Sequence, residues 1–296
     1  MTDRHTLQKL VSCGGMVRLP RETFCIDYPI LVPSGTVIDG CGAVIATELV
    51  TKHTLWVRGR EDVTIRNLTI QGDWSINSGD PATIGAAIQI QESRNVAVEN
   101  VTIRDMMGRG IVAASNVDDL TIRGCHIRNC AISVFLFKGI RGSIIESNRI
   151  FDSRIMGIYV DDATEGDTQE TSIPNCLTIV RGNIIVGGGI SPRNTGVGIA
   201  ASASTDTIIS ENIVRCFGSE TRISHGIILN NGQGQFHQGK RTVVTGNILS
   251  EHTGYGLYSM KQEDFIESGN VYSGNGLGDC KLIGEQPDER VTTQGE

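Results

Sequence analysis

The sequence predicts an all-β chain that winds into one single-stranded parallel solenoid, and three observations indicate this. Short strand-like segments recur along almost the whole chain, as they do in repeat architectures. Within each segment apolar residues alternate with period two, and no helical period of 3.6 residues competes with it. The 296 residues include 36 Gly but only 7 Pro, a composition typical of short strands joined by tight turns.

The first recurring segment consists of a strand, a one-residue kink and a second strand. It runs from "VTIRNLTIQG" at 63–72 through "TIVRGNIIVG" at 178–187 to "IESGNVYSG" at 266–274. The residues at the kink are Leu68, Val101, Cys125, Asn148, Asn183, Asn212, Asn247 and Asn270. Because the last five kinks are all Asn, we expect their side-chain amides to form a hydrogen-bonded ladder from coil to coil.

A third strand, which usually opens with Gly, lies between these segments, as in "GIVAASN" (110–116) and "GIYVDDA" (157–163). The shortest repeat of three strands spans 23 to 24 residues, which predicts about nine or ten coils of a parallel β-helix. A short amphipathic helix around Leu7 is expected to cap the first coil. We assign residues 1–280 to the β-helix domain, with its N-terminal cap at 1–20, and residues 281–296 to a polar C-terminal tail.

Alternation along the Gly-led strands predicts which side chains face outward. The first outward column is Gln89, Val112, Ser133, Tyr159, Ala200, Ile228 and Tyr258, and the second is Gln91, Ala114, Phe135, Asp161, Ser202, Asn230 and Met260. Longer repeats place extra residues beside this face, at 73–84, 163–175, 188–196, 217–225 and 232–240. Insertions on one face of a solenoid usually border its binding site. We therefore expect the Gly-led sheet to form the floor of a groove.

Three residues at this groove are predicted to be catalytic. Asp161 and Tyr159 share the outward face of one strand, and His225 ends an inserted loop directly before a floor strand. A carboxylate, a phenol and an imidazole are groups that transfer protons in general acid–base catalysis. Each also has an ordinary structural interpretation, because Asp often closes a turn and a Tyr or His often packs against a loop.

Further residues on the same face are predicted to bind substrate: Asp162, Asn230, Lys261, Tyr258, Gln89, Gln91, Phe135 and His237. The scattered Cys and His residues have no metal-binding spacing, so we predict no metal site and no cofactor. One exception is left open, because the adjacent carboxylates Asp161 and Asp162 could hold a Ca²⁺ ion that bridges to an anionic sugar.

Charge and cysteine usage narrow the class of partner. Lys and Arg number 26 and Asp and Glu number 33, a net charge of −7, which disfavours nucleic acid and anionic membranes as partners. The first residues, "MTDRHTLQKLVSCGG", lack the apolar run of a signal peptide. We therefore predict a cytoplasmic protein whose eight Cys are reduced core thiols and not disulfides.

With the N-terminal segment "GGMVRLPRETFCIDYPILVPSGTVIDGCG" (14–42), these repeats resemble the right-handed parallel β-helices of the pectin-lyase-like superfamily over nearly the whole chain. The resemblance implies that fold and a carbohydrate-active enzyme, a lyase, hydrolase or epimerase acting on a polysaccharide or oligosaccharide. In the lyase or epimerase version, a base in the groove removes the proton α to a uronate carboxylate. A cation or an Arg then stabilises the resulting enolate.

Two functions from other classes stay open. The first is an intracellular isomerase or cyclase acting on a small, partly apolar metabolite, which the expected free thiols and the outward Phe135–Tyr159 patch favour. The second is a non-catalytic, spike-like binding module, often trimeric, whose outward Arg or Phe residues are buried between copies. The expected partner is thus a carbohydrate or another small molecule, and a homo-oligomer is left open.

Overall fold

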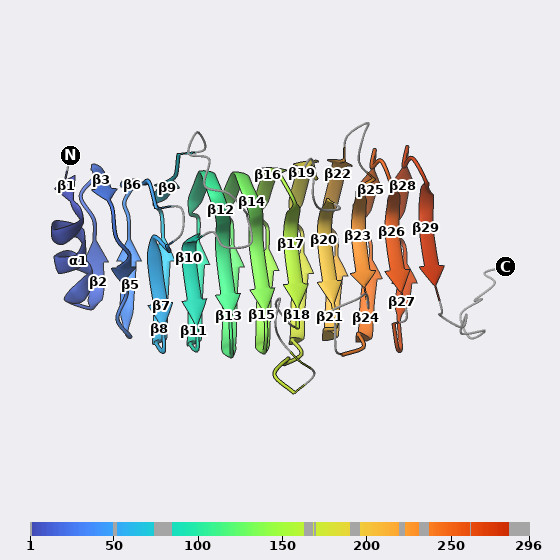
Figure 1. Cartoon of the computed structure of the whole chain (residues 1–296), viewed down its shortest axis with the longest axis horizontal. Coiled ribbons are helices and arrows are strands. Elements are labelled where there is room, and N and C mark those ends of the chain that lie inside the picture. Colours follow the sequence, from blue (N-terminus) through green and yellow to red (C-terminus); the bar gives the residue numbers. More distant parts are fainter. Residues whose placement is uncertain are drawn as a thin grey trace.

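A computed structural model describes residues 2–49, 52–73, 85–162, 168, 170–189, 196–218, 223–230, 237–260 and 262–283. The chain winds as a parallel solenoid whose strands lie side by side along its long axis (Figure 1). Neighbouring coils pair in parallel, for example β10 with β12 and β14 with β17. The predicted all-β parallel β-helix is confirmed.

One face of the solenoid is a sheet of ten described strands, one for each coil. It is formed by β2 (Gly15–Arg18), β5 (Thr36–Asp39), β8 (Glu61–Arg66), β11 (Arg94–Glu99), β13 (Val117–Arg123), β15 (Ile140–Glu146), β18 (Cys176–Arg181), β21 (Thr205–Ser210), β24 (Lys240–Thr245) and β27 (Ile266–Ser268). The strand count agrees with the nine or ten coils predicted from the repeat length.

A second, larger sheet wraps around the other two faces, and its Gly-led strands make one of them. That face, called the floor below, consists of β4 (Ile30–Leu31), β7 (Leu55–Arg58), β10 (Ala86–Gln91), the second halves of β12 (Thr102–Ala114) and β14 (His126–Phe137), β17 (Met156–Asp161), β20 (Val197–Ser202), β23 (His225–Asn230), β26 (Tyr255–Met260) and β29 (Gly278–Ile283).

The third face carries the strands that follow each kink. These are β1 (Thr2–Asp3), β3 (Thr23–Ile26), β6 (Val44–Thr47), β9 (Thr69–Gln71), the first halves of β12 and β14, β16 (Arg149–Ser153), β19 (Ile184–Gly188), β22 (Ile213–Phe217), β25 (Ile248–Ser250) and β28 (Val271–Ser273). The strands β12 and β14 continue through the corner between the two faces without a break.

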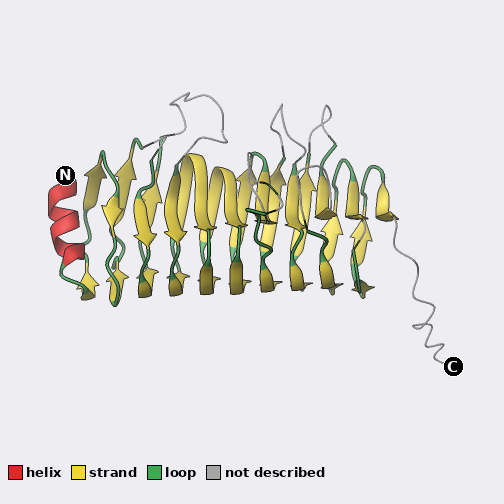
Figure 2. Cartoon of the chain, turned by 60° about the horizontal axis from the view of Figure 1, so that its bottom comes forward, coloured by secondary structure: helices red, strands yellow, loops and turns green. Residues whose placement is uncertain are grey.

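The predicted N-terminal cap is helix α1 (Arg4–Ser12), which closes one end of the solenoid (Figure 2). It buries Leu7 and Val11 against the first coil. The Gln8 side chain completes the hydrogen bonding of an edge strand, because its amide donates to the Leu31 carbonyl at 3.0 Å and its oxygen accepts from the Leu31 N–H at 2.8 Å. The helix therefore covers a strand edge that would otherwise be open to pairing.

At the other end, β29 runs to Ile283, so the predicted domain boundary after Cys280 falls inside a strand. Residues 284–296, most of the predicted tail, lie outside the described residues.

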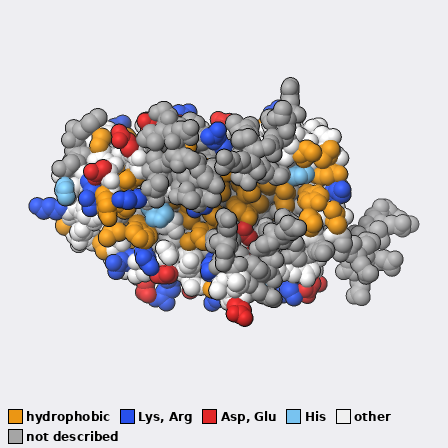
Figure 3. Space-filling model, in the orientation of Figure 1, with side chains coloured by type: hydrophobic (Ala, Val, Ile, Leu, Met, Phe, Trp, Pro, Cys, Tyr) orange, Lys and Arg blue, Asp and Glu red, His pale blue; other side chains and the backbone are white. Residues whose placement is uncertain are grey.

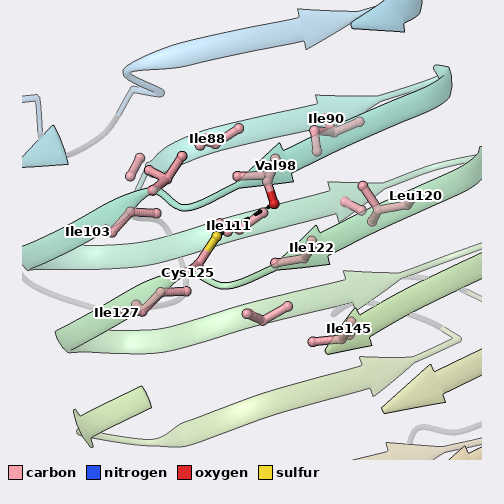
Figure 4. Close-up of a cluster of buried hydrophobic side chains, with 14 of the residues drawn as sticks. Ile88, Ile90, Val98, Ile103, Ile111, Leu120, Ile122, Cys125, Ile127 and Ile145 are labelled. Atoms are coloured by element: carbon pink, nitrogen blue, oxygen red, sulfur yellow. Dashed lines mark hydrogen bonds between the residues drawn. The ribbon is translucent and has the colours of Figure 1, made fainter. Parts of the chain in front are cut away.

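The interior is a continuous column of aliphatic side chains, part of which is shown in Figure 4. The five Asn residues at the kinks form the predicted ladder along one corner. Each side chain from Asn148 to Asn247 donates to the amide oxygen of the next Asn, at 2.9, 2.9, 2.9 and 2.8 Å. The same oxygens accept the backbone N–H groups of the preceding kinks, so the ladder satisfies polar groups that the corner buries.

The glycines that open the floor strands are required by close contact between coils. A Cβ atom on Gly157 would lie 2.5 Å from the carbonyl oxygen of Gly198, and one on Gly198 would lie 2.7 Å from that of Gly226. Neither distance is compatible with a real side chain. In these coils the corner therefore accepts only Gly, which explains why the floor strands usually open with Gly.

The register of one floor strand differs from the prediction by two residues. The alignment of the sequence repeats placed Ser133 beside Tyr159 and Phe135 beside Asp161, and this was wrong. In the structure Phe135 pairs with Tyr159 and Phe137 pairs with Asp161. A register shift within β12 alters the residue count before the corner, and alternation with period two cannot detect a slip of two.

The cysteines are all free of disulfides, although most are not core residues. Cys125 and Cys130 are buried, and desolvation raises the pKa of each thiol to about 12. The prediction of core thiols was wrong for four others, Cys13, Cys25, Cys41 and Cys280, which are exposed.

Candidate functional site

The floor presents a column of outward side chains that runs through neighbouring strands. Strand pairing aligns Leu31, Trp56, Gln89, Val112, Phe135, Tyr159, Ala200, Ile228 and Tyr258 in this column. In Figure 3 a band of hydrophobic side chains runs along the middle of the face in view. Several of these apolar side chains form a cluster separate from the interior, with Val112, Ala114 and Phe135 buried and Phe137 and Tyr159 packed against them.

Two of the predicted catalytic residues, Tyr159 and Asp161, form a hydrogen-bonded dyad at the end of β17. They lie two positions apart on one strand, so their side chains leave the same face. The Tyr159 hydroxyl donates to one carboxylate oxygen of Asp161. The other oxygen accepts the backbone N–H of Asp162 at 2.9 Å. Both carboxylate oxygens of Asp161 are therefore occupied from within the protein.

The environment of Asp161 raises the pKa of its carboxyl to a value near neutral pH. The side chain is only 8% exposed. The pKa of the carboxyl is raised to about 7, mainly by desolvation and with a smaller contribution from the charge of Asp162, while the hydrogen bond from Tyr159 works in the opposite direction. A group with a pKa close to ambient pH both accepts and releases protons readily. The dyad is thus equipped for proton transfer.

Aromatic stacking joins the dyad to a half-buried arginine two strands away. The Phe135 and Tyr159 rings stack with centroids 4.9 Å apart and planes 5° apart. The Arg109 guanidinium lies over the same Phe135 ring, 5.2 Å from its centroid. Burial lowers the pKa of Arg109, yet a guanidinium remains a cation in proteins. A fixed positive charge therefore lies two strands from the dyad.

Arg109 was not predicted as a site residue, because strict alternation assigns it the inward orientation of Ile111. The corner at Gly110 breaks that alternation. A Cβ on Gly110 would meet the side chain of Ile127 in the interior at 3.2 Å, so Gly110 and Ile111 are two consecutive inward positions and Arg109 is turned outward. The signal in the sequence was the Arg directly before a Gly that opens a floor strand.

Two of the predicted insertions meet behind the dyad at Asp162, which is completely buried. The backbone N–H of His237, from the 232–240 insertion, donates to Asp162 Oδ2 at 3.1 Å. The His237 ring lies 3.0 Å from the Ser172 hydroxyl, in the 163–175 insertion. Asp162 and His237 therefore hold two segments together beside the floor, and Asp162 is not accessible from it.

The third predicted catalytic residue, His225, lies elsewhere on the floor. It pairs through Val197 with Met156, at the opposite end of β17 from Asp161 and two strands away, a separation of roughly 19 Å from strand geometry. Its ring stacks on Tyr255 and Tyr258 at 5.8 and 5.3 Å. Desolvation lowers the pKa of His225 to about 4, so the imidazole is neutral at pH 7.

The remaining predicted binding residues are spread along the floor. Tyr258 and Gln89 occupy the column of Tyr159, each three strand spacings away, or ~14 Å. Gln91 is partly exposed and its amide donates to Glu92 at 3.4 Å. The Asn230 side chain and the whole of Lys261 lie outside the described residues, as do parts of every predicted insertion.

Within the described part of the chain, no group of three or more His, Cys, Asp or Glu side chains is arranged to hold a metal ion. The described helix is also too short and too polar to cross a membrane.

The chain belongs to the right-handed β-helix family, because the family model described as "Right handed beta helix region" matches residues 53–216. This also confirms the predicted handedness. Among curated proteins no sequence matches the chain.

Solved structures of carbohydrate-related proteins have a similar fold. An alginate lyase from Paenibacillus sp. str. FPU-7 is 16% identical, with 96% of this chain and 98% of that chain covered and a TM-score of 0.71. The mannuronan C-5 epimerase AlgE4 A-module of Azotobacter vinelandii is 15% identical, with 95% and 94% covered and a TM-score of 0.55. The tailspike of E. coli bacteriophage HK620, in complex with a pentasaccharide, is 14% identical, with 95% and 55% covered and a TM-score of 0.70. At these identities the likeness shows the fold alone.

Proposed function

We propose that the protein is a carbohydrate-active enzyme, a polysaccharide lyase that acts on a uronate-containing glycan at the Tyr159–Asp161 dyad. The observation that carries this proposal is the dyad itself: a phenol hydrogen-bonded to a buried carboxyl whose pKa is raised to about 7. The solved lyase and epimerase of the same fold act on alginate or mannuronan by their names, which supports the choice of substrate class.

Within the dyad, Tyr159 is the group that meets the substrate. Asp161 is 8% exposed and both of its oxygens accept hydrogen bonds, whereas Tyr159 is only partly buried. In the reaction, the Tyr159 oxygen takes the proton α to the uronate carboxylate while the Tyr159 hydroxyl proton passes to Asp161. Asp161 is thereby the proton acceptor behind the catalytic phenol.

Arg109 supplies the charge that this step requires. Removal of the α proton leaves an enolate whose negative charge develops on the carboxylate oxygens, and a preorganised cation stabilises it most. A sugar ring lying on the floor between Arg109 and Tyr159 would place its carboxylate toward Arg109 and its α carbon toward Tyr159. The buried Phe135 ring contacts both the Tyr159 ring and the Arg109 guanidinium and so fixes their relative positions.

A single dyad favours elimination over epimerisation. In the elimination the C–O bond to the neighbouring sugar breaks, a C=C double bond forms, and the proton stored on Asp161 returns through Tyr159 to the departing oxygen. Epimerisation needs a second proton donor on the opposite face of the ring. His225, the other predicted acid–base residue, lies roughly 19 Å from Asp161 by strand geometry.

The test is turnover of a panel of uronate polysaccharides by the wild type, Tyr159→Phe and Asp161→Asn, with and without Ca²⁺. Lyase activity is read as ultraviolet absorbance from unsaturated ends, hydrolysis as reducing ends without that absorbance, and epimerisation by NMR. We expect absorbance from the wild type and a loss of roughly 10²-fold or more in both variants. Tyr272→Phe and Asp206→Asn, on other faces of the solenoid, are the matched controls and should retain full rates.

Silence of the wild type across the panel would overturn the proposal. That result would favour a metabolite isomerase or cyclase, with which the apolar cluster around Phe135 is consistent, or a non-catalytic binding module.

A further inference from the structure

A second groove, separate from the dyad, lies at the N-terminal end of the floor and is called the N-terminal groove below. It has a volume of about 860 Å³ and lies between α1, the segment that leads into β4, and β7. Basic and aromatic side chains line it: Arg4, Lys52, Arg60, His53, Tyr28 and Trp56. None of its described lining residues is Asp or Glu.

The positive charges of this groove are gathered without described counter-charges. The Arg4 guanidinium and the Lys52 ammonium lie 4.5 and 4.3 Å from the centroid of the same ring, Tyr28. Arg60 lines the same space. Like charges that gather around one groove repel each other, so the arrangement is most favourable when the groove holds an anion.

Unsatisfied donors point to the same kind of ligand. The indole N–H of Trp56 and the Nε of Arg4 are buried, and neither has a hydrogen-bond partner among the described residues. Indole and guanidinium groups donate and do not accept. Since buried polar groups are normally paired, the N-terminal groove is complementary to a ligand that presents several acceptor oxygens.

The aromatic side chains add a preference for a ring. Trp56 is a large flat surface with an N–H at one edge, and the His53 ring packs against it at 5.5 Å. Such a side chain packs against the apolar face of a sugar ring. An inorganic anion or a phosphate chain would use the cations and leave Trp56 unexplained.

The groove is also in line with the dyad. Trp56 shares the outward column of Gln89, Val112, Phe135 and Tyr159. Four strand spacings separate Trp56 from Tyr159, or ~19 Å. The strand that carries Arg109 lies between them, and the Arg109 charge adds to the desolvation that lowers the pKa of His53. An extended acidic chain lying along the floor therefore meets positive charge at both places.

We propose that the N-terminal groove is a binding site for a carboxylate-bearing sugar residue of an acidic glycan, remote from the reacting bond. This rests on the proposed function for the nature of the chain, and the site itself is defined by its own cations and donors. It anchors long substrates: one uronate lies on Trp56 among Arg4, Lys52 and Arg60 while another lies at the dyad beside Tyr159.

Binding is measured by the fluorescence of Trp56. The chain has two Trp residues, 56 and 74, so Trp74→Phe leaves Trp56 as the only reporter. Asp161→Asn is added so that the ligand is not consumed. The probes are oligogalacturonate and oligomannuronate, their methyl esters as uncharged matches, a neutral maltooligosaccharide, and inorganic sulfate.

We expect a saturable change with the acidic oligosaccharides and little with the esters, the neutral chain or sulfate. Lys52→Gln and Arg60→Gln should each weaken binding about tenfold, because each removes one charge-assisted contact. Arg141→Gln, on the ten-stranded sheet, is the matched control and should bind normally. Thermal melting of each variant shows whether it is folded. Equal responses to esters and acids, or to sulfate alone, would overturn the proposal, as would normal binding by both folded variants.

Failure of this site and failure of the proposed function give different results. A Trp56 response without turnover by the wild type would refute the lyase and leave the glycan site standing. Turnover with no Trp56 response, and with the same KM for long substrates in Lys52→Gln as in the wild type, would refute the site and leave the lyase.

Discussion

The hydroxyl of Tyr159 donates a hydrogen bond to the carboxylate of Asp161 two positions further along the same strand. The relationship joins a partly buried phenol to a buried carboxyl whose pKa is raised to about 7 by desolvation. It depends on the alternation of β17, which brings residues i and i+2 onto one face, and it sets the expected pH dependence of the site.

Activity should rise with pH through neutrality. Asp161 accepts a proton only when it is ionised, so kcat/KM on a uronate substrate should increase with a midpoint near the pKa of about 7. The measurement is initial rate between about pH 5 and pH 9 at constant ionic strength. A profile that is flat across this range would show that Asp161 is not the proton acceptor.

Stability of Asp161→Asn relative to the wild type should also depend on pH. The pKa of the Asp161 carboxyl rises from an ordinary value of 3.8 to about 7 in the fold, so ionisation favours the unfolded chain. The contribution of Asp161 to stability therefore falls as pH rises from about 4 to 7. Since Asn cannot ionise, the free energy of unfolding of the variant should rise relative to that of the wild type over this window, by on the order of a few kcal/mol.

Urea unfolding at both ends of that window makes the measurement. Asp206→Asn is the control with the opposite sign, because the hydrogen bond from Arg241 lowers the pKa of Asp206. The stability of Asp206→Asn should fall slightly relative to that of the wild type as pH rises. If both variants changed in the same direction, the assignment to local environment would be wrong.

Interrupting the asparagine ladder should destabilise the fold most at its middle. Asn212 is fully buried. Its side chain accepts two hydrogen bonds from Asn183 and donates to the Val180 carbonyl and to the Asn247 side chain. Asn212→Ala leaves these buried groups unpaired and should cost about 3 kcal/mol or more. Asn270→Ala, at the partly exposed end of the ladder, should cost clearly less. Equal losses of free energy of unfolding would refute the importance of burial.

The glycine column should reject even a methyl group. A Cβ on Gly198 would lie 2.1 Å from Val214 Cγ1 and 2.7 Å from the Gly226 carbonyl, so Gly198→Ala should cost about 3 kcal/mol or more. The comparison variant is Gly35→Ala, where nothing lies within 4 Å and only the positive φ of 65° opposes the change. There the cost should be about 1 to 2 kcal/mol. Thermal unfolding of both variants checks the difference.

The sequence repeats predicted the fold because every coil has the same local structural requirements. The Asn kinks, the Gly corners and the period-two alternation each reflect a contact made between neighbouring coils, such as the hydrogen bond between Asn183 and Asn212. Tyr159 and Asp161 were predicted together for the same reason, since residues two apart on a strand share a face.

What the sequence by itself determined was therefore the solenoid, its capping helix and the face that carries the dyad, all properties of local pattern. Tertiary structure alone decided the rest. It turned Arg109 outward at a corner where alternation fails, placed Phe135 against Tyr159 through a register shift, and separated His225 from Asp161 by two strands. It also packed α1 against β4, so that side chains from α1 and β7 line the same N-terminal groove. Residues far apart in sequence meet only through the packing of coils. A repeat pattern predicts the path of each coil, but it does not predict which side chains become neighbours on the outward face.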